Sequence, residues 1–156
     1  APYNNFCPIN PQDTLRCPSG CGATAIAQIA NYHKYFGNNR FSSVDRYANS
    51  TPPINIDEDS TQLDFPSFYE LNKHLDTLQY KYENNLTLED KDKAALCFAC
   101  GIMTQTKYSS SGSATFAKEI YSAFVEKMNY ASAEFLSVNN AFYEELITPL
   151  PDSMIK

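Results

Sequence analysis

Tryptophan is absent from the 156 residues of this chain, and histidine occurs only twice, at His33 and His74. Basic residues are also few, with 12 Lys and Arg against 18 Asp and Glu, which gives a formal net charge of −6. Because nucleic-acid surfaces are strongly basic, we expect no nucleic-acid partner. No apolar run approaches the roughly 20 residues of a membrane-spanning helix, so we expect no membrane span.

Aromatic and aliphatic residues, in contrast, are plentiful. Hydrophobic residues make up 43% of the chain, with 11 Tyr and 10 Phe, a composition that excludes a disordered chain. A chain of this length can bury one core without metal or disulfide support. Residues 1–156 are therefore expected to form a single domain or part of one.

The N-terminal residue is Ala1, without an initiating Met or an apolar leader. We interpret this as a processed N-terminus or an excised piece from which any signal segment is already gone. Asn49 and Asn85 each begin an Asn-x-Ser/Thr triplet, which would carry a glycan only in a eukaryotic secretory route.

Five cysteines are present, and an odd number leaves at least one thiol unpaired within the chain. They are Cys7, Cys17, Cys21, Cys97 and Cys100. The spacing of Cys97 and Cys100 is that of metal ligands, but their apolar surroundings favour packing in a buried helix, with a disulfide or a metal site as alternatives. A bridge between Cys7 and Cys17 stays open at this point.

The order of elements is expected to be mainly helical. Residues 1–20 hold four prolines and predict an irregular lead-in, followed by a buried central helix that starts at Cys21, with Ser19 as N-cap and Gly37 as stop. Residues 38–64 predict a long surface connection with room for a short strand. Two further helices are predicted, one from Pro66-Ser67 to Leu78 and one capped by Thr87 that runs to Cys100 and a Gly101 C-cap.

Beyond these helices, residues 104–108 predict a short strand and residues 109–113 a serine-rich loop. Ser113 is expected to cap a helix on which apolar residues recur every four positions. These residues are Phe116, Ile120, Phe124 and Met128. A last helix is predicted from Asn140 to Ile147.

Cys21 stands where a Pro-Ser-Gly turn meets the first turn of the central helix. The positive end of the helix dipole favours thiolate over thiol, and the unpaired N–H groups of the first turn can bind an oxyanion. Gly20 leaves room for a substrate backbone. These features suit a nucleophile, although a small buried cysteine would show the same local sequence.

Three segments in order resemble the streptopain family of cysteine peptidases. The first is residues 2–8, Pro-Tyr-Asn-Asn-Phe-Cys-Pro. The second is residues 20–29, Gly-Cys-Gly-Ala-Thr-Ala-Ile-Ala-Gln-Ile, followed by Tyr-His-Lys-Tyr at residues 32–35. The third is Ala-Cys-Gly at residues 99–101 with Tyr-Ser-Ser-Ser-Gly-Ser-Ala at residues 108–114.

The resemblance implies an α+β, papain-like fold. This chain would form mainly the helical, nucleophile-bearing lobe, with the β-rich, His-bearing lobe largely absent. Cys21 matches the family's catalytic nucleophile, and its backbone N–H matches the oxyanion hole. Ser111, Gly112 and Ser113 match the loop that binds the substrate backbone. Two positions depart from the family pattern, because Gly22 replaces a Val, which would loosen the helix start, and Leu15 replaces a Gln that serves as second oxyanion donor.

The family's catalytic His, with the Trp-rich strands after it, has no counterpart in this chain. His33 lies 12 residues after Cys21, about 18 Å along one helix, and so cannot reach the thiol. His74 lies in a mixed polar and apolar stretch that predicts a surface or rim position. The His should therefore come from a second chain or a later segment, and proteolytic nicking after Lys156 is the simplest origin of a second chain.

The sequence thus predicts a secreted or surface-exported cysteine endopeptidase that acts on protein or peptide substrates. By resemblance it would be made with an inhibitory pro-segment and would need neither a metal nor an organic cofactor. One alternative is a catalytically inactive homologue that acts as a binding or regulatory module, which the missing His favours. A third reading is an acyltransferase that uses the same nucleophile.

Overall fold

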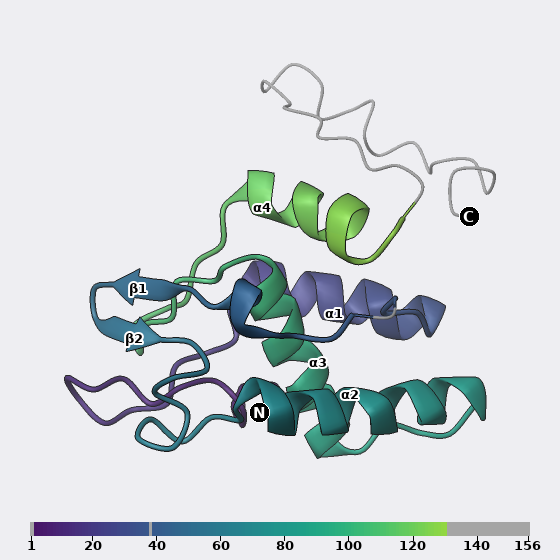
Figure 1. Ribbon diagram of the computed structural model, residues 1–156, viewed down its shortest axis with the longest axis horizontal. Helices are drawn as coiled ribbons and strands as arrows, with labels where there is room; N and C mark the ends of the chain where they lie inside the picture. Colours follow the sequence, from purple (N-terminus) through teal and green to yellow (C-terminus); the bar gives the residue numbers. More distant parts are fainter. Residues whose placement is uncertain (1, 38, 131–156) are drawn as a thin grey trace.

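The computed structural model describes residues 2–37 and 39–130 and has the mainly helical α+β character that the sequence predicts. Its elements are α1 (Cys21–His33), β1 (Ala48–Ser50), β2 (Pro53–Asn55), α2 (Phe68–Glu83), α3 (Asp90–Met103) and α4 (Ala117–Ser122), which runs into a π-helical turn at Ala123–Lys127. In Figure 1, α3 crosses between α1 and α2, and α4 lies on the other side of α1. Among the described residues, no helix is both long enough and apolar enough to cross a membrane.

The centre of the core is α3. Every residue from 94 to 103 is buried, as expected for a helix that is apolar on all sides. The helix begins at Asp90 rather than directly after Thr87, because the Asp92 carboxylate accepts a hydrogen bond from the Glu89 N–H at 2.7 Å. Asp92 is itself buried and forms an ion pair with Lys81 at 2.6 Å.

Gly101 does not end α3, contrary to the predicted C-cap. The helix continues to Met103, and Gly101 instead allows a close approach of the Tyr108 ring. An ideal Cβ at this position would lie 2.2 Å from the Tyr108 hydroxyl oxygen. The glycine is therefore required by packing inside the helix and not by a left-handed backbone.

The start of α2 is where the sequence predicts it. Ser67 and Glu70 form a capping box, with the Ser67 N–H donating to Glu70 Oε2 at 3.0 Å. The helix continues to Glu83, beyond the predicted end at Leu78, and buries an apolar row. This row is Phe68, Leu71, Leu75, Leu78 and Tyr82.

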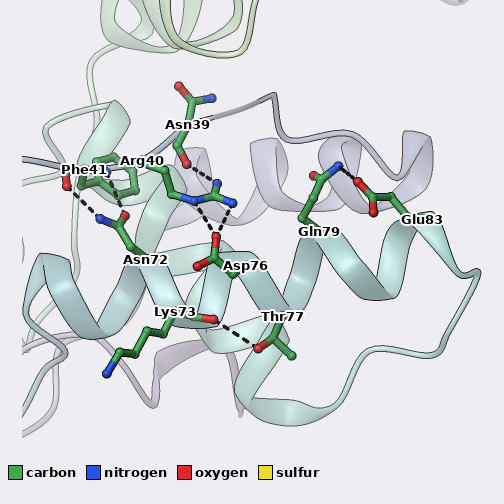
Figure 2. Close-up of polar contacts among 9 residues, drawn as sticks. All are labelled: Asn39, Arg40, Phe41, Asn72, Lys73, Asp76, Thr77, Gln79 and Glu83. Carbon is green, nitrogen blue, oxygen red and sulfur yellow. Dashed lines mark hydrogen bonds and ion pairs between the residues drawn. The ribbon is translucent and has the colours of Figure 1, made fainter.

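The outer face of α2 is polar and partly tied to the chain around residue 40, as Figure 2 shows. Asp76 pairs with the Arg40 guanidinium at 2.6 Å. Asn72 accepts from the Phe41 N–H and donates to the Phe41 carbonyl, each at 2.9 Å. Gln79 donates to Glu83 at 2.8 Å.

The connection from residue 39 to residue 64 is more buried than the predicted surface connection. It contains the antiparallel β1–β2 hairpin, with Asn49 opposite Ile54. Four of its hydrophobic side chains are buried in the core, which explains why this turn-rich segment is ordered. They are Phe41, Ile54, Ile56 and Leu63.

The lead-in to α1 is irregular, as predicted, apart from a 3-10 turn at Pro2–Asn4 and an isolated bridge between Ile9 and Arg16. The predicted strand at 104–108 is reduced to one bridge, between Lys107 and Ala114. The next helix, α4, begins at Ala117 after Phe116, so Ser113 does not cap it. The predicted helix at 140–147 lies outside the described residues.

Candidate active site

Cys21 is the first residue of α1 and its side chain is exposed. The residue that precedes the helix as N-cap is Gly20, with φ +86°, rather than the predicted Ser19. Within the part of the chain that the structure describes, no side chain caps the first turn, which leaves its N–H groups available at the positive end of the helix dipole. At its other end, α1 stops at His33, where Lys34 adopts a left-handed conformation ahead of the predicted Gly37.

Ser19 stabilises the turn before Cys21 through two hydrogen bonds. Its N–H donates to Asn4 Oδ1 at 2.9 Å, and its hydroxyl shares a 2.9 Å hydrogen bond with Thr24 Oγ1. Thr24 in turn donates to the Gly20 carbonyl at 2.8 Å. Asn4 belongs to the lead-in segment 2–8, so that segment fixes the backbone immediately before Cys21.

The serine loop lies directly against this turn. An ideal Cβ at Gly20 would be 3.0 Å from the carbonyl oxygen of Ser113, and one at Gly22 would be 3.2 Å from both Thr115 Cβ and Ile120 Cδ1. The two glycines that flank Cys21 thus let the loop and α4 approach the nucleophile turn closely. Gly22, where the family pattern has Val, is buried in this contact.

The three substrate-binding candidates form the outer part of this loop. Ser111 and Gly112 are exposed, and Ser113 is half-buried. Two backbone hydrogen bonds between Lys107 and Ala114, at 2.8 and 3.1 Å, close the base of the loop. Its backbone is therefore held beside the nucleophile turn while its tip stays accessible.

Neither histidine belongs to this site. His33 is the last residue of α1, at the end opposite Cys21, and its ring contacts Tyr32. His74 packs against Phe6 in a tilted arrangement, with ring centroids 4.8 Å apart, and lines an open pocket of about 600 Å³. That pocket contains no residue of the nucleophile turn or the serine loop. Burial, with the nearby Lys91 ammonium, lowers the pKa of His74.

The other four cysteines are buried free thiols. Burial raises the pKa of Cys17 to about 11 and that of Cys97 to about 12, and it raises the pKa of Cys7 and Cys100 as well. They therefore stay protonated and unreactive near neutral pH. Across residues 2–37 and 39–130, no three His, Cys, Asp or Glu side chains are grouped to hold a metal ion. Packing is the role that the surroundings of Cys97 and Cys100 support.

Leu15, the position that departs from the family's Gln, is 61% exposed, and its side chain has no hydrogen-bond donor. A polar residue near Leu15 was not predicted from the sequence to have a role. Asn10 is buried and donates from Nδ2 to Ser110 Oγ at 2.7 Å, so it joins the lead-in to the serine loop. Nothing in the local sequence around Asn10 signals a contact with a residue 100 positions away.

The two glycosylation triplets differ in accessibility. The Asn49 amide is buried and donates to the Tyr108 carbonyl at 2.8 Å, so it is not free to receive a glycan in the folded chain. Asn85 is exposed, and its Oδ1 accepts a hydrogen bond from Lys34 Nζ at 2.6 Å.

Comparison with known proteins agrees with this geometry. The model of the Peptidase C10 family matches residues 1–154, nearly the whole chain. A search of curated proteins finds no match. With a family match of this extent, the chain belongs to the peptidase C10 family, the streptopain family of cysteine peptidases.

Proposed function

We propose that this chain is the nucleophile-bearing part of a secreted cysteine endopeptidase, with Cys21 as its nucleophile. The observation that carries the proposal is the position of Cys21, exposed at the uncapped start of α1 and flanked by the two glycines that pack against residues 113–115. Family membership supports a cysteine-type hydrolase. By the same likeness, the enzyme would be made with an inhibitory pro-segment that it carries before activation.

The chemistry is acyl transfer. A His takes the proton of the Cys21 thiol, and the thiolate attacks the carbonyl carbon of the scissile peptide bond. The backbone N–H of Cys21 stabilises the oxyanion, and the protonated His gives its proton to the leaving amine. Water then attacks the thioester, releases the carboxylic acid and restores the thiol. The exposed backbone of the loop at 111–113 would hold the substrate chain in register.

The His in this scheme comes from a second chain or a later segment, because His33 and His74 lie away from Cys21. The outward face of α1 supports a covering partner. Cys21, Ala25, Gln28, Ile29 and Tyr32 are exposed and follow one another along this face. None of the 13 residues of α1 is Asp, Glu, Lys or Arg, whereas the exposed face of α2 carries several charges.

An inactive homologue that acts as a binding or regulatory module is the second candidate, favoured by the absence of a His beside Cys21. A peptide epoxide of the E-64 type separates the two. We expect the complete protein to take up one equivalent at Cys21 and to lose peptidase activity in proportion. The four buried cysteines, with raised pKa values, should remain unmodified in the folded protein. A protein that takes up no epoxide and cleaves no peptide would support the binding module.

Whether a partner covers the outward face of α1 can be tested by the reactivity of tyrosines in the active, complete protein. Tyr32 on α1 is 79% exposed and Tyr80 on α2 is 59% exposed, so Tyr80 is a matched internal control. If the His-bearing polypeptide packs along α1, tetranitromethane should nitrate Tyr32 several-fold more slowly than Tyr80. Nitration of Tyr32 at the rate of Tyr80 would contradict a partner on this face, without bearing on Cys21.

A further inference from the structure

The turn that precedes the nucleophile segment is built around a buried asparagine. Asn10 is 4% exposed, and its Oδ1 accepts from the Gln12 N–H at 2.9 Å. Its backbone N–H donates to the Leu15 carbonyl at 2.8 Å, and its carbonyl accepts from the Thr14 N–H at 2.9 Å. These bonds close a compact turn over residues 10–15, which ends six residues before Cys21.

This turn is hydrogen-bonded to the serine loop through the hydroxyl of Ser110. Asn10 Nδ2 donates to Ser110 Oγ at 2.7 Å, and Ser110 Oγ donates to Asp13 Oδ2 at 2.5 Å. The other carboxylate oxygen of Asp13 accepts from the Leu15 N–H at 3.0 Å. The hydroxyl of Ser110 is thus both donor and acceptor, and its position is set from both sides.

The other supports of the loop tip come from within the loop, where the Gly112 N–H donates to the Ser109 carbonyl at 3.2 Å and the Ser109 N–H donates to Ser113 Oγ at 3.3 Å, and from the nucleophile turn. On its nucleophile side, the Ser113 carbonyl lies against Gly20. At the tip, an ideal Cβ on Gly112 would have no atom within 4 Å. Inside the loop, Ser109 contacts Ser111 through a 3.0 Å hydroxyl hydrogen bond. Among the described residues, the side-chain tether from outside the loop to its 109–113 segment is therefore Asn10–Ser110–Asp13.

We propose that Asn10 and Asp13, through Ser110, are positioning residues that set the serine loop at 111–113 for binding of the substrate backbone. The inference deepens the proposed peptidase function and rests on it. Binding to a backbone requires the loop groups to be held within a few tenths of an ångström, and a side-chain tether from outside the loop helps to hold them there. The tether acts on substrate binding and does not touch the reacting thiol.

Ser110→Ala in the complete protein is the decisive variant, because it removes one hydroxyl and leaves both partners in place. We expect KM for a peptide substrate to rise about tenfold with kcat nearly unchanged, the effect of one lost hydrogen bond on ground-state and transition-state binding alike. Ser110→Thr, which keeps a hydroxyl, should restore most of the affinity. Ser43→Ala, the same change at an exposed serine, should have no effect.

Two thiol reagents distinguish a positioning role of Ser110 from a general disturbance of the nucleophile turn. In Ser110→Ala, labelling of Cys21 by a peptide epoxide should slow about tenfold, while labelling by iodoacetamide, which needs no loop, should not. Equal slowing with both reagents would overturn the proposal, because the variant would then disturb the nucleophile turn itself. An unchanged KM would also overturn it. If the parent protein neither cleaves peptides nor takes up the epoxide, the proposed function fails instead.

Discussion

Peptide hydrolysis by the complete protein is expected to fall by about 10⁴-fold or more when Cys21 is replaced by alanine. The thiolate is the group that forms the acyl-enzyme, so its loss removes the covalent pathway and leaves only binding and oxyanion stabilisation. Because Cys21 is exposed at the helix start, the change should leave thermal stability nearly unaltered. Initial rates on a fluorogenic peptide, compared with the melting temperature, check both parts.

Three further variants show whether the loss belongs to Cys21 alone. Cys97→Ala removes a buried thiol and should keep full activity per folded molecule. His33→Ala and His74→Ala should also keep full activity, since neither imidazole lies at the site. Loss of activity in His33→Ala would point instead to a second copy of this chain that supplies the base. Substantial activity in Cys21→Ala would refute the assigned nucleophile.

The sequence was a good guide to what depends on local patterns. The apolar run without a breaker after Gly22 predicted the helix α1, although its cap is one residue later than predicted, and Pro66-Ser67 predicted the start of α2. Both signals work because helix starts are set by residues within one turn. The position of Cys21 in the first turn follows from the same local pattern, whereas its exposure is known only from the structure.

The contacts that assemble the site were not predictable in this way. Asn10 and Ser110 are 100 residues apart, and Asn4 reaches the Ser19 N–H across 15. A local pattern carries no information about such pairs, because each is created by the fold of the whole chain. The predicted caps Ser19, Thr87 and Ser113 were wrong, since the residue that precedes each helix lies one to three positions later, at Gly20, Glu89 and Phe116.

The role of Gly101 also depends on a tertiary contact that the local sequence does not predict. We expect its substitution to have the largest effect on stability. Within a helix, Gly→Ala normally stabilises by about 1 kcal/mol. At position 101, however, the new Cβ would lie 2.2 Å from the Tyr108 hydroxyl oxygen, in a core where neither group is exposed. We expect Gly101→Ala to destabilise the fold by about 3 kcal/mol, the cost of overpacking a core. Urea denaturation monitored by circular dichroism measures this change.

A second substitution, at Tyr108, should relieve the clash that Gly101→Ala creates. The Tyr108 hydroxyl is buried and has no hydrogen-bond partner among residues 2–37 and 39–130, and burial raises its pKa, so Tyr108→Phe alone should be neutral or slightly stabilising. With the oxygen gone, the nearest ring atom to the new Cβ is Tyr108 Cζ at 3.2 Å, a distance that a small shift relieves. The double variant should therefore recover about 2 kcal/mol, measured as the coupling energy of a double-mutant cycle. Additive effects of the two changes would contradict this account, because the cost of Gly101→Ala would then not come from contact with the Tyr108 hydroxyl.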